Sequence, residues 1–421
     1  MPPTRASPYP CRFPRFNEDM GERLKITVIT SLFPTAAEPY RGAAIWSTLR
    51  ELKAYAELDV YCTLLKYPVG LRPKDFRYHA EPADTRQYSL SSQTVEFFAI
   101  PLLSRMFNGY SIYRSVRGSM GGRKPDLILG YYIYPEGYAT LRLGEELGIP
   151  VVVSARGSDL RKVDGSPAVR RMTAETLRRS AAVLCVSTDL ANIARSFGAP
   201  AERVHTVRNG IDSSVFRFMD QSEARRALGI PAGERLVVFI GWLSALKGTP
   251  QLIEAIQMLN RSHGPHRLAL IGEGRLEANL RTQVASLGIE DRVQFLGARG
   301  APQIAEWLNA ADLLCLPSES EGCPNAIVEA LSCGTPVVAT SVGGIPELVD
   351  ERCGVLLPSN RAEEIAEGLQ KAFRMSWNRA AIAASHSRSW SKVAEETYRV
   401  CEAMRLNPRV PSLESAYGIS A

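Results

Sequence analysis

Short apolar segments alternate with longer amphipathic segments along the first half of the chain. We expect strands there at residues 24–30, 59–65, 126–130, 151–154, 182–186 and 204–207. Helical periodicity lies between them, at residues 42–56, 170–179 and 190–197. Short apolar strands that alternate with helices are typical of parallel sheets whose two faces are both covered.

The same alternation restarts after residue 217, and it is more regular there. We expect strands at residues 236–241, 267–271, 293–296, 313–316 and 336–340, and helices at 249–260, 276–287, 301–310 and 324–333. Thr249 and Pro250 form an N-cap and first-turn pair at one helix start. The pattern predicts an α/β fold of two doubly wound parallel sheets that face each other across a cleft.

The rhythm divides the chain into segments. We expect a first domain at residues 21–216, a second at 217–388 with a hinge near 213–224, and a last helical segment at 389–421. The sequence leaves open whether that last helix crosses back to the first domain. Residues 1–20 contain Pro and Arg but no apolar core, which predicts a mobile tail rather than a secretory signal.

Composition excludes several classes of protein. Of 421 residues, 45% are hydrophobic and 22% are charged, which excludes a wholly disordered chain. No apolar run reaches the length of about 18 residues that a transmembrane helix needs. The eight cysteines form no C-x-x-C pair, which favours reduced thiols in a cytoplasmic protein.

Charge is unevenly distributed. Residues 1–216 contain 29 Lys and Arg against 21 Asp and Glu, whereas the remainder contains 21 against 23. A basic first half favours an anionic partner, and we expect a membrane surface or a phosphate-bearing acceptor rather than nucleic acid. Residues 105–124 combine basic and apolar side chains and are either an interfacial segment that holds a lipid-linked acceptor or a basic helix packed on the domain.

The segment 318–330, SESEGCPNAIVEA, carries the strongest chemical signal. It follows an apolar strand, turns at Gly322 and continues as a helix with Pro324 at its start. The free N–H groups at residues 325–327 would suit a phosphate, because a helix start carries partial positive charge. Glu321 and Glu329 would repel a phosphate and are expected to accept hydrogen bonds from sugar hydroxyls; alternatively they are a helix-start charge and a solvated helical residue.

Two further loops carry candidate phosphate ligands. Lys247 follows the strand at 236–241 and precedes Gly248 and a capped helix, so its ammonium group is expected in the cleft, where it can neutralise a diphosphate. The alternative is a lysine in a surface loop. In the first half, Gly42 at a helix start offers a second cradle of N–H groups.

These segments together resemble the donor domain of family 4 retaining glycosyltransferases, which have the GT-B fold of two Rossmann-like domains. The resemblance is carried by FIGWL-x-x-x-KG, LIGEG, VQFLG, AADLLCLPS, EGCPNAIVEA, CGTPVVAT and GGIPELV. The first half adds SARGSDL and RNGID, which are similar to the acceptor-side loop and the interdomain segment of that family. YYIYPEG at 131–137 resembles members that act in teichuronic-acid and other surface-polysaccharide pathways, and the likeness covers residues 24–405.

The resemblance implies roles for residues on the donor side. Glu321 would contact the hydroxyls of the donor sugar, and Glu329 would contact the ribose of the nucleotide. Lys247 would bind the diphosphate together with the N–H groups of Asn325 and Ala326.

The resemblance also implies contacts from the surrounding loops. Gly42 and Gly322 would lie at the diphosphate and the donor sugar, and Arg299 would lie near the base. Arg156 and Asp159 would line the acceptor side near the reacting carbon.

Two positions depart from the family pattern. The family usually has Arg where Trp242 stands, and that arginine is one of its two cationic diphosphate ligands. It often has His where Arg156 stands. We expect Arg156 to restore part of the missing charge from the opposite wall, whereas Trp242 either binds donor or packs in the cleft.

The implied activity is retaining transfer of a sugar from a UDP- or GDP-linked donor to a glycan or polyprenyl-diphosphate-linked acceptor, at the inner face of the plasma membrane. No cofactor or metal is expected, and no Asp-x-Asp pair occurs in the chain. Two alternatives stay open: a non-catalytic subunit that binds nucleotide sugars, and a sugar-nucleotide epimerase.

Overall fold

The first domain is built on a parallel sheet. The computed structural model describes residues 23–35, 41–67, 90, 92–98, 105–161, 163 and 166–406; the expected tail at 1–20 and residues 407–421 lie outside this part of the chain. Seven strands pair in the order β3-β2-β1-β4-β5-β6-β7, and every neighbouring pair is parallel. The strands are β1 (Leu24–Thr30), β2 (Ala56–Lys66), β3 (Ser92–Phe98), β4 (Leu127–Tyr131), β5 (Val151–Ala155), β6 (Ala182–Cys185) and β7 (Val204–Thr206).

Helices connect these strands and cover both faces of the sheet, because parallel strands need crossover connections. They are α1 (Ala43–Leu52), α2 (Asn108–Ser119), α3 (Tyr138–Leu147), α4 (Ser158–Arg161), α5 (Pro167–Arg179) and α6 (Thr188–Ser196), with the short turns η2 (Arg105–Phe107), η3 (Ile133–Gly137) and η4 (Ala201–Arg203). Apolar side chains between helices and sheet form the core on each face of this domain.

The second domain repeats the architecture with six strands in the order β10-β9-β8-β11-β12-β13, again all parallel. The strands are β8 (Arg235–Ile240), β9 (His266–Ile271), β10 (Val293–Gly297), β11 (Leu313–Leu316), β12 (Val337–Thr340) and β13 (Gly354–Leu357). The helices are α7 (Gln221–Leu228), α8 (Thr249–His263), α9 (Glu277–Ser286), α10 (Ala301–Ala310), α11 (Asn325–Ser332), α12 (Ala362–Arg374) and α13 (Arg379–Ser385), with turns η5 (Ala245–Lys247) and η6 (Ile345–Glu347).

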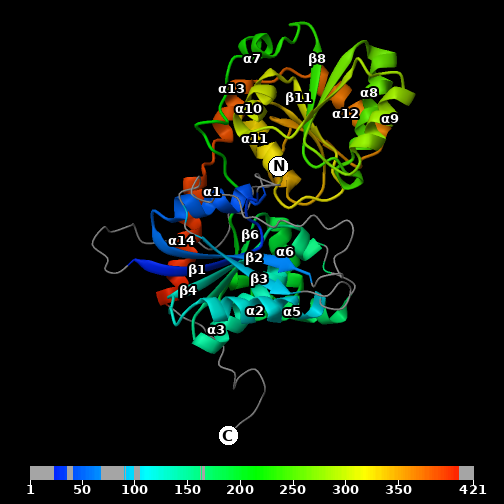
Figure 1. Ribbon diagram of the computed structural model, residues 1–421. Coiled ribbons are helices and arrows are strands. Elements are labelled where there is room, and N and C mark those ends of the chain that lie inside the picture. The colour runs from blue at the N-terminus through cyan, green and yellow to red at the C-terminus, as the bar shows by residue number, and fades with distance from the viewer. Residues whose placement is uncertain are drawn as a thin grey trace, which may run out of the picture.

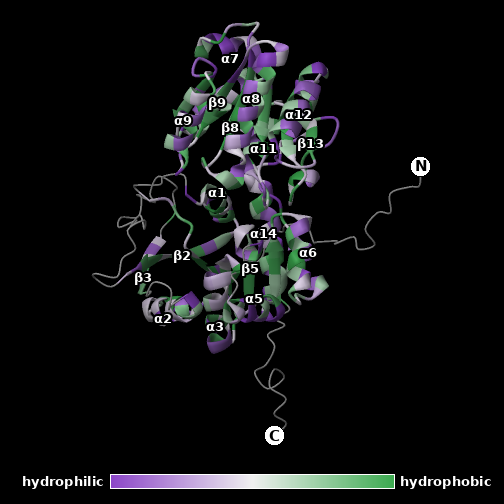
Figure 2. Cartoon of the chain, turned by 90° about the vertical axis from the view of Figure 1, so that its right-hand side faces the viewer, coloured by the Kyte–Doolittle hydropathy of each residue, from purple (hydrophilic) through white to green (hydrophobic). Residues whose placement is uncertain are grey.

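The prediction of two doubly wound parallel sheets is therefore confirmed. Figure 1 shows them as two lobes, with α1 at the edge of the first lobe that faces α11 of the second. In Figure 2 apolar residues concentrate on the strands within each lobe, and polar residues lie on the outward faces of the helices. In each sheet the strand order reverses once, between β1 and β4 and between β8 and β11. Ligands of open α/β folds bind at such reversals, beyond the carboxyl ends of the strands.

Several element boundaries differ from the prediction. The helix expected at 42–56 ends at Leu52, because residues 53–55 form a turn that leads directly into β2. The Arg23 guanidinium donates to the carbonyls of Lys53 and Ala54 at 2.6 and 2.8 Å and so holds that turn. Strands β3 and β13 and helices α3, α4, α7, α12 and α13 were not predicted. Both strands lie at an edge of their sheet, where one partner is missing and the apolar signal is short.

The last helix, α14 (Trp390–Leu406), returns to the first domain. It packs along α1, and its Trp390 and Val400 join the apolar cluster that contains β1 (Figure 1). The ring of Tyr398 stacks on Tyr55 with 5.4 Å between centroids. A parallel bridge pairs Ile211 with Ser389, so the two segments that cross between the domains run side by side.

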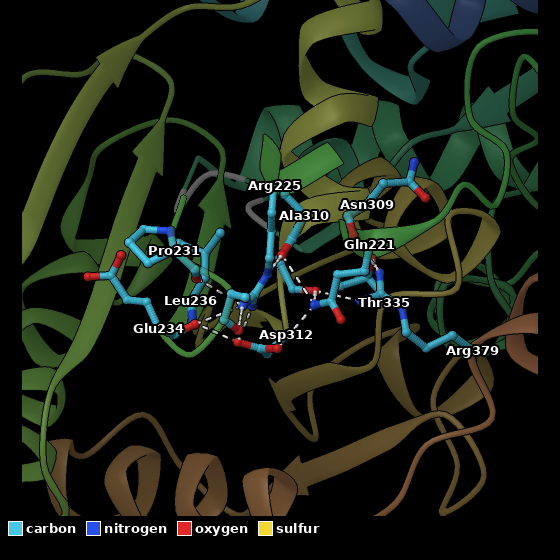
Figure 3. A network of polar contacts seen from close by, with 12 residues as sticks. Gln221, Arg225, Pro231, Glu234, Leu236, Asn309, Ala310, Asp312, Thr335 and Arg379 are labelled. Carbon is cyan, nitrogen blue, oxygen red and sulfur yellow. Dashed lines mark hydrogen bonds and ion pairs between the residues drawn. The ribbon is translucent and has the colours of Figure 1, made fainter. Parts of the chain in front are cut away.

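A buried polar network ties the first crossing segment to the second sheet (Figure 3). The Arg225 guanidinium of α7 lies 2.7 Å from Asp312 and donates to the carbonyl of Ala310 at 3.0 Å. Asn309 accepts from the backbone N–H of Met219 at 2.8 Å and donates to the carbonyl of Arg217 at 3.1 Å. These bonds fix the chain where it enters the second domain.

Arg379 of α13 ties the second crossing to the same sheet (Figure 3). It donates to the carbonyl of Ala311 at 2.7 Å and to Thr335 Oγ1 at 3.0 Å. Burial lowers the pKa of Arg379 to about 10, because desolvation disfavours the charged guanidinium, and the charge of Asp312 opposes this shift. Among the described residues, no helix combines the length and the apolar character needed to cross a bilayer.

Candidate active site

The loop after β11 and the start of α11 lie at the reversal of the second sheet. Pro324 caps α11 in extended conformation, and its carbonyl accepts from the backbone N–H of Ile327 at 3.1 Å. The N–H group of Ile327 is therefore not available to a phosphate, and two of the three expected N–H groups remain. The N–H groups of Asn325 and Ala326 have no acceptor among the described residues, and they retain the positive end of the helix dipole.

Lys247 and Glu321 are brought together by the loops that follow β8 and β11. Lys247 Nζ lies 2.5 Å from Glu321 Oε1; the Glu321 side chain is 9% exposed, whereas that of Lys247 is 28% exposed. The loops touch because Gly248 has no side chain: a Cβ there would lie 2.2 Å from the carbonyl oxygen of Pro317.

 At this glycine φ is 67°, in the left-handed region that side chains rarely adopt. The pair places a cation and a carboxylate next to the start of α11.

Glu329 lies in the second turn of α11, eight positions after Glu321 in the chain. Desolvation raises the pKa of its carboxyl from 4.5 to about 7. A carboxyl held near its midpoint at neutral pH is a feature of binding and catalytic sites, since ordinary surface glutamates are fully ionised. Glu321 is therefore ion-paired, whereas Glu329 has, among the described residues, no cation that lowers its pKa.

Arg156 reaches the start of α11 through one intermediate residue. Its guanidinium donates to Asn209 Oδ1 at 3.0 Å. The Asn209 amide in turn donates to Asn325 Oδ1 at 2.8 Å and to the carbonyl of Cys323 at 3.1 Å. Asn209 stands in the RNGID segment, but sequence reasoning assigned it no role. The chain of bonds puts a cation of the first domain beside the N–H groups of α11.

The two domains meet at Gly322. A Cβ at this position would lie 2.6 Å from the carbonyl oxygen of Arg156, so only glycine lets the loop after β5 approach the loop after β11 this closely. Arg208 lies 3.1 Å from Glu347, and Glu347 also accepts from the backbone N–H of Asp189 at 3.0 Å. These contacts close the cleft on the side of α6.

Asp159 holds the loop after β5 in place. Its Oδ1 accepts from the backbone N–H groups of Arg156 at 3.0 Å and Gly157 at 2.8 Å, and its Oδ2 accepts from Ile133 at 3.1 Å. Burial raises the pKa of the Asp159 carboxyl, and the three N–H groups oppose that rise. This geometry makes Asp159 a positioning residue, because its oxygens are directed at the backbone.

The other predicted donor residues lie on separate loops. Gly42 caps α1 with φ 69°, and a Cβ there would lie 2.4 Å from the carbonyl oxygen of Leu32. Trp242 follows β8 and is 44% exposed. Arg299 follows β10 on an exposed loop and donates to the carbonyl of Ala298 at 3.0 Å. Among the described residues, no hydrogen bond or ion pair links any of these three to Lys247 or Glu321.

Sequence reasoning missed Arg161, the last residue of α4. Its guanidinium forms an ion pair with Asp189, and the charge of Glu321 acts on it across the cleft. Burial lowers the pKa of Arg161. No simple sequence signal marks it, since it is brought to the second domain by the closure of the cleft. Among the described residues, no group of three or more His, Cys, Asp or Glu could hold a metal ion.

Comparison with known proteins matches both halves of the chain. Residues 220–390 match the family "Glycosyl transferases group 1", and residues 50–215 match "Glycosyltransferase Family 4". A D-inositol 3-phosphate glycosyltransferase of Pseudarthrobacter chlorophenolicus is 31% identical over 311 residues, which cover 68% of this chain and 74% of that relative. A putative teichuronic acid biosynthesis glycosyltransferase, TuaC of Bacillus subtilis, is 28% identical over 394 residues, which cover 90% and 94%.

A solved crystal structure has the same fold. The crystal structure of Anabaena HepE in complex with UDP superposes with a TM-score of 0.70 at 22% identity, and the match covers 90% of this chain and 100% of that one. The likeness extends over both domains, so the GT-B fold implied by the sequence motifs is confirmed.

Proposed function

The chain belongs to the group 1 glycosyltransferases, and from this premise we propose that it transfers a sugar, with retention at the anomeric carbon, from a nucleotide-diphosphate sugar to a lipid-linked glycan acceptor in polysaccharide biosynthesis. The observation that supports the proposal most is the Lys247 and Glu321 pair beside the free N–H groups of α11. It offers a cation and a helix start to a diphosphate, and a carboxylate to a sugar.

The reaction breaks the bond between the anomeric carbon and the diphosphate oxygen and forms a bond to the acceptor oxygen. The acceptor proton passes to the departing phosphate oxygen on the same face. Charge that develops on the leaving group is stabilised by Lys247 and by the N–H groups of Asn325 and Ala326, which are already oriented before the reaction. In this mechanism Lys247 exchanges Glu321 for the diphosphate, and Glu321 becomes available to the sugar hydroxyls.

The nucleotide would lie along α11 and the loops of the second domain. Glu329 would accept hydrogen bonds from the ribose hydroxyls, and Arg299 would lie near the base. Gly42 and the start of α1 would approach the diphosphate from the first domain. UDP is one donor nucleotide that fits the proposal, since HepE was crystallised with it; GDP is the other. The proposed reaction uses no metal or cofactor.

The acceptor side carries a surface suited to an anionic membrane. Met106, Phe107 and Tyr110 of η2 and α2 are 40%, 59% and 50% exposed. Arg114 of α2 lies over the ring of Tyr110. Apolar side chains interleaved with basic ones favour peripheral attachment to the inner face of the plasma membrane. We expect sedimentation with vesicles that contain anionic lipid and none with neutral vesicles; failure to sediment with the anionic vesicles would contradict this attachment.

The transfer itself is tested by removing the cation. We expect Lys247→Ala to lower kcat roughly a hundred- to thousandfold, the usual loss when one preorganised donor to a developing anion is removed. Release of UDP or GDP from the nucleotide sugar is the measurement. Lys392→Ala, on an exposed part of α14, is the matched control and should leave the rate unchanged. Equal rates for wild type and Lys247→Ala would contradict the proposed site.

A further inference from the structure

The first domain contains a cavity of about 520 Å³ at the carboxyl ends of β1, β2 and β4. This size is in the range of small-molecule sites. Its walls combine apolar and aromatic side chains, among them Phe33, Phe97 and Tyr134, with the cationic side chains of Arg41 and Arg105. The roles assigned above to residues of the active site do not use this cavity, except that Asp159 forms part of its wall.

Four side chains that line the cavity have a buried polar atom with no hydrogen-bond partner among the described residues. These atoms are Thr63 Oγ1, Asn108 Oδ1, Glu136 Oε2 and Thr173 Oγ1. They come from four different elements: β2, α2, η3 and α5. Buried polar groups are nearly always paired, so four unpaired ones around one cavity indicate a site built for a ligand that carries several hydrogen-bonding groups.

Glu136 is the most informative of the four. It is 2% exposed, and the Ser31 hydroxyl hydrogen-bonds its carboxyl. Burial raises the pKa of Glu136 to about 7, the charge of Asp159 raises it further and that of Arg41 lowers it. The carboxyl can therefore accept from a hydroxyl or donate to one near neutral pH.

The backbone beside Glu136 is also unusual. Tyr132 has φ 76° and is, in the described part of the chain, the one residue other than glycine with positive φ. Such conformations persist where the surrounding structure holds them, and they concentrate at binding sites. The Tyr132 side chain forms part of the cavity wall.

The loop after β5 lies between the cavity and the loop after β11 that carries Gly322. Asp159 lines it and also binds the backbone of Arg156 and Gly157, and Arg156 touches Gly322. We propose that the cavity binds a cyclic polyol, a sugar or cyclitol ring of the acceptor, and that Glu136 determines specificity by hydrogen-bonding a ring hydroxyl. Aromatic walls with separate hydroxyl partners fit the apolar faces and polar edge of such a ring. This inference rests on the proposed function.

Binding is measured by titration calorimetry and saturation-transfer NMR without any nucleotide, using myo-inositol, methyl α-D-glucopyranoside and octyl glucoside as probes. We expect the polyols to bind wild type, and to bind Glu136→Ala at least tenfold more weakly. Glu136→Gln keeps the shape of the side chain and one acceptor oxygen, so this variant should retain part of the affinity for the polyols. Cyclohexanol, with one hydroxyl, should bind both proteins equally weakly. Tighter binding of octyl than of methyl glucoside supports a lipid-linked source of the ring, and equal binding supports a free one.

Two controls keep the outcome decisive. Glu146→Gln removes a carboxylate from the solvent-exposed face of α3 and should bind like wild type. Thr173→Val removes a second unpaired atom without changing charge, and should weaken binding even if Glu136→Ala folds poorly. Equal affinity of wild type, Glu136→Ala and Thr173→Val for the polyols, or no binding of any polyol to wild type, overturns the proposal. Nucleotide-sugar binding is measured separately, so failure of the donor site is distinguished from failure of the cavity.

Discussion

At the scale of single residues, the ion pair of Lys247 with Glu321 holds the cation and the carboxylate of the proposed site together. Lys247 and Glu321 are 74 positions apart in the chain, and the resemblance gave each a separate ligand; the structure pairs them directly. The pairing could not be predicted, because it depends on how closely Gly248 lets two loops approach. Asn209, Arg161 and Glu136 were missed for a similar reason: their importance comes from what lies opposite them in space.

Glu329 gives a pH dependence at this scale. Its pKa is raised to about 7, and the ionised carboxylate is the form that accepts from both ribose hydroxyls. Donor binding must then release a proton below that pH, so donor affinity should fall as the pH drops from 8 to 5. The limiting slope is about tenfold per pH unit for one linked proton.

Titration calorimetry at several pH values measures this slope. Glu329→Gln keeps the shape of the side chain but cannot ionise, so its weaker donor affinity should not change across the same range. A pH slope that persists in Glu329→Gln would show that another group is responsible.

At the scale of elements, the sequence predicted the central strands and the edge strands β7 and β10 well, but it missed the edge strands β3 and β13. Strands β1 and β11 and helix α10 have the predicted bounds, because buried strands and a proline-started helix carry strong local signals. The end of α1 was placed four residues too late, since the Arg23 contacts that hold the turn at 53–55 come from another element. The site lies where the repeating pattern is interrupted by glycine, and those loops were recognised from motifs rather than from periodicity.

The network around Arg225 makes a prediction about stability. Arg225 is 6% exposed and pairs with Asp312. Asp312→Ala leaves this guanidinium buried without its carboxylate, and such a change typically costs about 3–5 kcal/mol. We expect a clear shift of the urea midpoint for unfolding of the second domain.

The exposed pair of Arg352 and Asp350 is the control, because solvent screens it. Asp350→Ala should change the midpoint little. If both variants unfold at the wild-type midpoint, the network does not anchor α7 as described.

At the scale of the whole molecule, the two domains are joined by crossing segments that run together, and α14 belongs to the core of the first domain. The cleft between them is closed by the contact of Gly322 with Arg156 and by the pair of Arg208 and Glu347. Donor loops and the loop after β5 therefore come together in this closed arrangement, which no local pattern in the sequence encodes.

Gly322→Ala tests this closure. The added methyl would lie 2.6 Å from the Arg156 carbonyl oxygen, so the loops must move apart. A displacement of about 1 Å in a reacting site can cost around a hundredfold in rate, and we expect a loss of that order in kcat with little change in melting temperature.

Gly233→Ala is the matched control, because a Cβ there meets no atom within 4 Å. It should behave as wild type in both measurements. An unchanged kcat in Gly322→Ala would mean that the contact between the loops is not needed for transfer.

The central claim is that a nucleotide sugar binds along α11 between Lys247 and Glu329. The most direct test is a thermal-shift screen of UDP- and GDP-sugars on wild type and on Glu329→Ala. We predict that at least one nucleotide sugar stabilises wild type and that this stabilisation is lost in the variant. If no nucleotide sugar stabilises wild type, or if the same one stabilises both proteins equally, the nucleotide sugar does not bind at Glu329 as proposed.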